Sequence, residues 1–287
     1  MADKHNPYEA KDTGHVWDDN IRELENPPPR WWMICLHISW ISVVIYLVLF
    51  PGLPLIDGAT KGILGWTQVK RLNAQVAEIE KIRKPFNDKI EMMSADEVLK
   101  DSELLGFAQA SAKALFGDNC AACHGAGGQG GPDFPVLADD DWLYGGSLES
   151  IIETVTDGRE GSMPAHGPTL SQQEIDDVVA FVVGLSSGKN HEAGKAVFMG
   201  QTAGEATCVM CHGEDAKGNP DMGGANLTDS IWRFDGSEAG IRHTIVNGVN
   251  DEGPLTRKAK MPEFGEKLSK TQIKKLALLV HQFGGGR

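Results

Sequence analysis

The stretch Cys120-Ala121-Ala122-Cys123-His124 decides the fold, and its pattern returns as Cys208-Val209-Met210-Cys211-His212. C-x-x-C-H is the attachment site of c-type haem, because two thiols form thioethers to the haem vinyls and the adjoining imidazole reaches one face of the iron. Two copies predict two covalently bound haems. Their thioether ligands are Cys120, Cys123, Cys208 and Cys211, and their first axial ligands are His124 and His212.

The cysteine count favours haem over the other uses of C-x-x-C. Four of the five cysteines lie in the two motifs, and the fifth, Cys35, lies in an apolar run. A tetrathiolate zinc site would need both pairs close together and would not explain a histidine after each second cysteine. A zinc site or a redox dithiol is therefore a distant second interpretation.

A sixth iron ligand is offered by two methionines in similar surroundings, Met163 before Pro164 and Met261 before Pro262. A thioether opposite an imidazole raises the reduction potential and closes the iron to added ligands. The pattern therefore predicts haems that carry electrons. For an isolated methionine the default is core packing, which we expect for Met199, Met210 and Met222.

Composition sets wide bounds on the remaining chain. Its 287 residues suffice for two or three small domains, and its 34 glycines point to loop-rich ones. Haem would supply part of each core, so the protein without haem should fold poorly. The net charge of −13 argues against nucleic acid as a partner.

The N-terminal region predicts a membrane anchor. Residues 1–30 are polar and acidic, which is typical of a poorly ordered arm. Residues 31–51 then hold an apolar run without Asp, Glu, Lys or Arg, close to the roughly 20 residues that a membrane-spanning helix needs. Pro51 should end this helix, and His37 within it is expected to hydrogen-bond a neighbouring helix.

A cleaved signal peptide is the competing interpretation of this run. The preceding arm is long and acidic, and no clear cleavage site follows, so we expect a retained anchor. Flanking charges do not settle the topology. C-type cytochromes as a class receive haem in the bacterial periplasm, which predicts a single-pass protein of the bacterial inner membrane with a cytoplasmic arm and periplasmic haem domains.

We expect residues 52–105 to form a periplasmic linker. It should contain an amphipathic helix that ends at Pro85. Its apolar residues recur at steps of three and four: Val69, Leu72, Val76 and Ile79. Such a stripe, with no core of its own, should lie on a partner subunit. Alternatively, the first haem domain covers it.

An internal duplication organises the rest, as domains 106–189 and 190–287. Each repeat has a leading helix, the haem motif, a short helix, a methionine loop and an apolar last helix, over 175–185 and 273–283. Capping-box spacing, Ser171 with Glu174 and Ser269 with Gln272, marks the start of each last helix. The fold class is mainly α, a single transmembrane helix followed by two tandem domains that resemble class I cytochrome c.

Several further residues have no assigned role. Trp142 and Trp232 share a repeat position and either pack on haem, with the indole N–H toward a propionate, or fill the core. Four histidines outside the motifs are expected not to bind iron: His166, His191, His243 and His281.

Charge differs between the repeats. Residues 106–189 hold twelve acidic and three basic residues, whereas residues 190–287 hold twelve of each. An acidic face steers basic partners, so the first repeat, notably Asp139 to Asp141, is the expected docking site of a basic soluble cytochrome c. The alternative is that the acidity only keeps the domain soluble.

The order of arm, anchor, linker helix and tandem Met/His haem domains resembles the dihaem subunit III, CcoP or FixP, of cbb3-type cytochrome c oxidases. The resemblance covers essentially the whole chain, including Trp31-Trp32 at the start of the anchor. It implies that electrons pass through two haems to a monohaem cytochrome subunit and then to the haem-copper subunit, which reduces oxygen and pumps protons. This chain would have no catalytic residues of its own.

The pairing of axial ligands is open at this stage. Spacing alone would pair His124 with Met163 and His212 with Met261. The family resemblance implies the crossed pairing, His124 with Met261 and His212 with Met163.

Other functions compete with an oxidase subunit. A freestanding dihaem carrier, similar to cytochrome c4, would not need an exposed apolar stripe beside the membrane. A dihaem peroxidase would need one open iron, although both repeats offer a Met-Pro ligand. The cytochrome subunit of a periplasmic dehydrogenase is excluded only by the resemblance.

Overall fold

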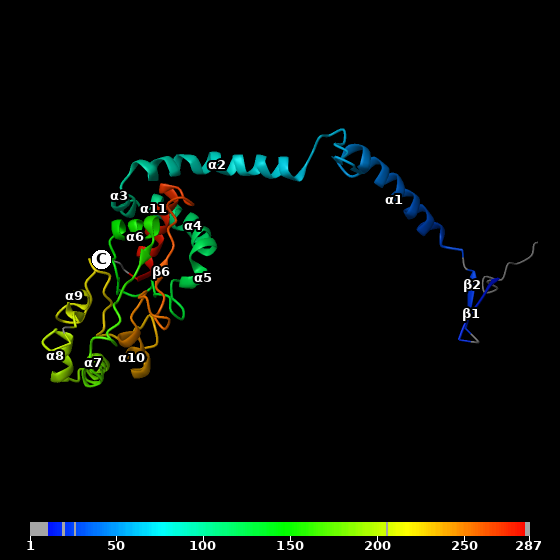
Figure 1. Ribbon diagram of the computed structural model, residues 1–287. Helices are drawn as coiled ribbons and strands as arrows, with labels where there is room; N and C mark the ends of the chain where they lie inside the picture. Colours follow the sequence, from blue (N-terminus) through cyan, green and yellow to red (C-terminus); the bar gives the residue numbers. More distant parts are fainter. Residues whose placement is uncertain (1–10, 19–20, 26, 205, 285–287) are drawn as a thin grey trace, which may run out of the picture. The chain divides into compact units, whose positions relative to one another are not determined.

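The computed structural model describes residues 11–18, 21–25, 27–204 and 206–284 (Figure 1). The chain forms two compact units, residues 1–82 and 83–287. Helices dominate both, and the strands are short antiparallel pairs. The mainly helical class with one N-terminal membrane-spanning candidate is confirmed.

The first unit begins with an exposed ribbon of β1 (Lys11–Trp17) and β2 (Ile21–Glu25). The expectation of an unstructured arm is therefore wrong for these strands, which hydrogen bonds and an Arg22–Asp12 ion pair of 2.6 Å hold together. The first residues of the arm, 1–10, lie outside the described part of the chain.

Helix α1 (Arg30–Leu49) is the anchor. Its mean hydropathy is 2.1 and none of its residues is buried, as expected of a helix that faces lipid. The predicted stop holds, because the helix ends just before Phe50 and Pro51. Inside the span, His37 Nδ1 donates to the Met33 carbonyl at 2.6 Å, so this nitrogen is satisfied within its own helix.

A small hairpin follows the anchor, formed by β3 (Pro54–Leu55) and β4 (Gly58–Ala59). The chain then returns to the anchor, since Ile63 N donates to the Val48 carbonyl at 2.9 Å. An aromatic pair, Phe50 edge-on to Trp66 at 5.6 Å, packs beside it.

Helix α2 (Gln68–Met92) continues through Pro85, where the sequence predicted its end. Proline removes one N–H and crowds one carbonyl, a cost of about 3 kcal/mol that tertiary contacts can outweigh. Here Ile90 is fully buried, and Lys274 Nζ donates to the Ile90 carbonyl at 2.7 Å. These contacts hold the last two turns of α2 in helical form.

The second unit contains the remaining helices. They are α3 (Ala95–Lys100), α4 (Ser102–Asn119), α5 (Ala121–His124), α6 (Leu148–Asp157), α7 (Gln172–Leu185), α8 (Glu192–Phe198), α9 (Cys208–His212), α10 (Glu238–Asn247) and α11 (Lys270–Gly284). Both predicted capping boxes form: Ser171 Oγ accepts from Glu174 N at 3.3 Å, and Ser269 Oγ accepts from Gln272 N at 3.3 Å.

Two hydrophobic cores form, and each contains residues of both repeats. Core 1 joins the end of α2 with α3, α4 and α6 from the first repeat to α11 from the second. Core 2 joins α7 from the first repeat to α8, α9 and α10 from the second. In Figure 1 the red α11 lies among α4 and α6, apart from α10, which precedes it in sequence. The last helices of the repeats are therefore exchanged.

The methionine loops cross over with these helices. Strand β6 (Lys260–Met261) pairs with β5 (Arg159–Glu160), and Met163 forms a bridge with Val249. Two glycines allow the approach: a Cβ on Gly158 would lie 2.4 Å from the Met261 carbonyl oxygen, and one on Gly248 would lie 2.5 Å from that of Met163. Both have positive φ, +71° and +70°, which glycine adopts without strain.

The cores therefore do not follow the contiguous division into 106–189 and 190–287. Core 2 is built from one continuous stretch, whereas core 1 is closed by the C-terminal residues, which return after core 2 is complete. The repeats are thus units of the sequence, whereas each core packs residues from both repeats.

Candidate haem sites

The His124 cavity lies in core 1 and has a volume of about 190 Å³. Helix α5 carries the first haem motif, and Cys120, Cys123 and His124 all line this cavity. Met261, from β6 of the second repeat, lines it as well. All four predicted ligands for one crossed haem site therefore lie around the same space.

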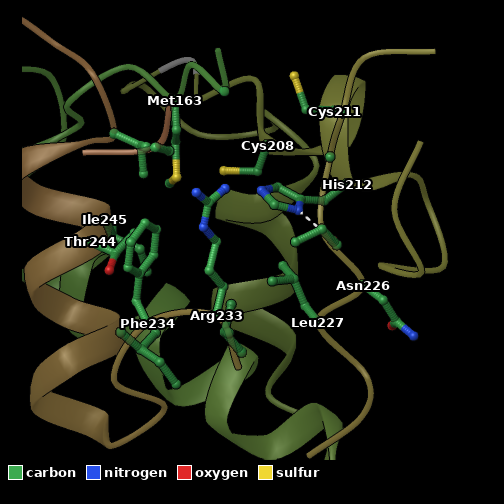
Figure 2. A pocket seen from close by; sticks show the side chains of 18 of the residues that line it. Met163, Cys208, Cys211, His212, Asn226, Leu227, Arg233, Phe234, Thr244 and Ile245 are labelled. Carbon is green, nitrogen blue, oxygen red and sulfur yellow. Dashed lines mark hydrogen bonds between the residues drawn. The ribbon is translucent and has the colours of Figure 1, made fainter. Parts of the chain in front are cut away.

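The His212 cavity lies in core 2 and has a similar volume, about 210 Å³. Cys208, Cys211 and His212 line it from α9, and Met163 lines it from the first repeat. Figure 2 shows Met163, Cys208 and His212 around a common space. Neither methionine lines the cavity of its own repeat's histidine.

Both motif histidines have the tautomer that iron requires. Nδ1 of His124 hydrogen-bonds the Pro135 carbonyl at 3.1 Å, and Nδ1 of His212 hydrogen-bonds the Ala225 carbonyl at 2.8 Å. A carbonyl only accepts, so Nδ1 carries the proton and Nε2 keeps a lone pair. The carbonyl also fixes the ring orientation, as partners of metal-bound histidines do.

Burial sets the protonation of these groups. It lowers the pKa of His124 and of His212, more than the carbonyl contacts raise it, and so favours the neutral ring that binds metal. Burial also raises the pKa of Cys120 to about 11 and raises that of Cys208. Thiols of this kind remain protonated at neutral pH. The two cysteine pairs also lie in separate cavities.

The cavities fit a haem in their other groups as well. Their linings are largely apolar, with Phe116, Ile151, Leu276 and Val280 around His124. The indole Nε1 of Trp142 is buried without a hydrogen-bond partner among the described residues. Trp142 lines the His124 cavity, so an acceptor such as a haem propionate would satisfy it.

The other sequence expectations have mixed outcomes. Met199 packs partly buried against core 2, as expected. Met210 and Met222 are 62% and 55% exposed, so the expectation that they fill the core is wrong. Cys208 and Cys211 line the His212 cavity, whereas Met210 on the same helix α9 does not.

Of the four histidines that we expected not to bind iron, three lie away from both cavities. His191 caps α8 by accepting from Gly194 N, and His243 Nε2 donates to the Leu255 carbonyl at 2.9 Å. His281 is on α11 and lines neither cavity. His166 differs, because it is buried and lines the His212 cavity three residues after Met163. No motif in the sequence indicates this position for His166.

A wall shared by both cavities was not expected. Its members are Leu143, Tyr144, Gly161, Arg233 and Ala259. Aligning the repeats at Trp142 and Trp232 shows that Arg233 stands where the first repeat has Leu143. That difference is the sequence signal that could have identified it.

Two cavities, each with a C-x-x-C-H motif on a short helix and a methionine opposite, joined to one membrane-spanning helix, define a membrane-anchored c-type cytochrome. Comparison with known proteins specifies it further. The model for the N-terminal domain of cytochrome oxidase-cbb3, FixP, matches residues 9–57, and that for cbb3-type cytochrome c oxidase subunit III matches residues 107–182 and 192–280. The chain belongs to this subunit III family.

Curated relatives agree over nearly the whole length. The cbb3-type cytochrome c oxidase subunit FixP of Azorhizobium caulinodans is 40% identical over 283 residues, covering 96% of this chain and 93% of the relative. FixP of Sinorhizobium medicae is 36% identical, with both chains fully covered. CcoP of Azospirillum sp. strain B510 is 38% identical, with coverages of 96% and 95%. The chain is therefore a haem c-binding, membrane-anchored electron-transfer subunit of a cbb3-type oxidase complex.

Proposed function

We propose that this subunit carries two haems c with axial ligands taken from opposite repeats. His124 and Met261 would hold the first iron, and His212 and Met163 the second. The observation that supports this pairing is the exchange itself, since each methionine lines the cavity of the other repeat's histidine. Cys120, Cys123, Cys208 and Cys211 would form the thioether bonds.

Each haem would accept and release one electron at a six-coordinate iron. The chain's own residues supply the conditions for this: apolar linings exclude water, and backbone carbonyls hold both imidazoles in one tautomer. A thioether opposite imidazole leaves no open position for a substrate. The subunit would therefore transfer electrons and perform no reaction of its own.

The electrons would come from a basic soluble cytochrome c. The acidic residues do not restrict the docking of this donor to the first repeat. Because the repeats exchange their last helices, the charges have to be counted for each core and not for each repeat. Residues 86–158 with 260–287, which contain core 1, hold sixteen acidic and nine basic residues, and residues 159–259, which contain core 2, hold fourteen and eight. Net charges of −7 and −6 give both halves a similar attraction for a basic donor.

The acceptors would be a monohaem cytochrome subunit and the catalytic haem-copper subunit, where oxygen is reduced. The haem cores would lie in the periplasm, with the arm in the cytoplasm. The apolar stripe of α2 supports a subunit contact near the membrane, since Val69, Leu72, Val76 and Ile79 are 43% to 64% exposed.

Purification in mild detergent tests this proposal. We expect the chain to copurify with b haem and oxygen-consuming activity, at two haems c per copy. A lone dihaem species with no associated subunits would contradict the proposal that these haems pass electrons to oxidase subunits. One haem c per chain would contradict the proposal of two haems.

A further inference from the structure

The wall between the two cavities is thin and partly made of backbone. Gly161 and Ala259, which line both cavities, are joined by a hydrogen bond of 3.0 Å from Gly161 N to the Ala259 carbonyl. The side chain of Asn250 clamps both, donating from Nδ2 to the Gly161 carbonyl at 2.7 Å and to the Ala259 carbonyl at 2.9 Å. Groups in this wall are therefore close to both haem sites.

Arg233 is the one charged residue of the five that form the shared wall. In Figure 2 its guanidinium lies in the space bordered by Met163, Cys208 and His212. It belongs to the second repeat, yet it also reaches the His124 cavity of core 1. The guanidinium lies 5.3 Å from the Phe234 ring, and Nε donates to the Asp133 carbonyl at 3.2 Å.

No carboxylate pairs with Arg233 within the part of the chain that the structure describes. Arg159, which lines only the His124 cavity, is by contrast paired with Glu153 at 3.0 Å. A half-buried cation without an anion is costly. The Asp133 carboxylate acts on Arg233 only through space, without an ion pair. Arg233 therefore has room for a direct anionic partner, and haem brings two propionate carboxylates.

The electrostatics of the surroundings agree with this position. Burial lowers the pKa of Arg233, although the group stays charged at neutral pH. Burial lowers the pKa of His124 as well, and the positive charge of Arg233 lowers it further. The positive charge of Arg233 therefore acts on His124, in the other cavity from His212.

We propose that Arg233 is a positioning residue shared by the two haem sites, which would hold propionate carboxylate at the common wall and supply one positive charge to both cavities. The inference rests on the proposed two-haem function. A fixed cation favours the reduced iron, which has one positive charge fewer, so Arg233 raises both reduction potentials. It brings the two haems into one electrostatic environment across which an electron passes.

Potentiometric titration of the haem-loaded, full-length protein, followed by visible absorption, tests this role. In Arg233→Met, both midpoint potentials should fall, each by about a tenfold shift in the reduction equilibrium, or about 59 mV for one electron. Arg233→Lys keeps the charge and should restore most of the loss. The matched control is Arg257→Met, because Arg257 stacks on the same Phe234 ring at 5.0 Å but lines neither cavity.

The inference is overturned if only one potential falls, if neither falls, or if Arg233→Lys and Arg257→Met lower both as far as Arg233→Met does. If Arg233→Met does not incorporate haem, Arg233→Gln is titrated in its place with the same criteria. Haem content and the low-spin spectrum are recorded on each variant. A wild-type protein with fewer than two haems c would refute the proposed function instead, before any potential is measured.

Discussion

Core 1 and core 2 derive from the same sequence repeat but are built along the chain in different ways. Core 2 uses a continuous stretch from Met163 to Val246, so all its helices follow one another. Core 1 starts at the end of α2 and is completed only by α11, after core 2 has been made. Core 2 can therefore be complete without the C-terminal helix α11, whereas core 1 cannot.

The largest expected effect follows from removing α11. A chain that ends at Ala259 loses Met261 and side chains that are almost fully buried in core 1, among them Leu276, Leu278 and Leu279. At about 1.5–3 kcal/mol each, such residues account for much of a typical domain stability of about 5–15 kcal/mol. We expect the His124 haem to lose its low-spin Met/His spectrum, with the His212 haem as internal control. Two normal haem spectra would show that core 1 does not depend on α11.

A smaller spectral effect is expected for substitution of His166, which lies three residues after Met163. The residue three positions after Met261 is Phe264, so core 1 has no corresponding histidine. Both histidine and methionine can bind iron, and His166 lines the His212 cavity together with Met163. We expect His166→Phe to keep the sulfur-to-iron charge-transfer absorption, because Met163 is the proposed ligand of the His212 haem. If His166 were the ligand instead, the His212 haem would show no such absorption in the unsubstituted protein, and its spectrum would change in His166→Phe but not in Met163→Leu.

The anchoring of α2 is specific to core 1. Lys274 Nζ donates to the carbonyls of Ile90 at 2.7 Å and Met93 at 2.5 Å, at the end of α2, where carbonyls lack helical partners. Charge-assisted bonds of this kind contribute about 1.5–3 kcal/mol. Lys274→Met should lower the free energy of unfolding by about that amount in denaturant titrations. Lys270→Met, at the exposed start of α11, is the control and should change little.

The smallest expected effect is a pH dependence at the junction of the two repeats. Burial, and then the neighbouring Asp141 carboxyl, raise the pKa of Asp229 to about 6. The folded state then holds a proton that the unfolded state has lost, so this pair's contribution to stability falls as pH rises from about 4 to 6. Asp229→Asn should remove that decline in unfolding experiments. An unchanged slope would show that Asp229 does not titrate in this way.

Much of the site was predictable from the sequence, because C-x-x-C-H, Met-Pro and the capping boxes are local signals. The exchange of helices was not. The last helices of the repeats carry the same apolar spacing, with Ile175, Val178 and Val182 matching Ile273, Leu276 and Val280. Such a pattern shows that a helix buries one face and does not show which core receives it.

Two other features, the helix through Pro85 and the place of Arg233, were also beyond local reasoning. Pro85 breaks helices on propensity alone. Its cost is outweighed by contacts from α11, such as the one from Lys274 to Ile90, which are 184 residues apart in sequence. Arg233 reads as an ordinary surface cation until the fold places it in the wall of two cavities. In both cases a long-range contact, which no single stretch encodes, decides the outcome.

In the proposed function, each iron takes its methionine from the other repeat. The most direct test removes one haem by Cys120→Ala with Cys123→Ala, which leaves only the His212 haem, and then records the sulfur-to-iron charge-transfer absorption. In that background we predict that Met163→Leu abolishes the absorption and Met261→Leu retains it. Retention in Met163→Leu with loss in Met261→Leu would contradict the exchanged pairing.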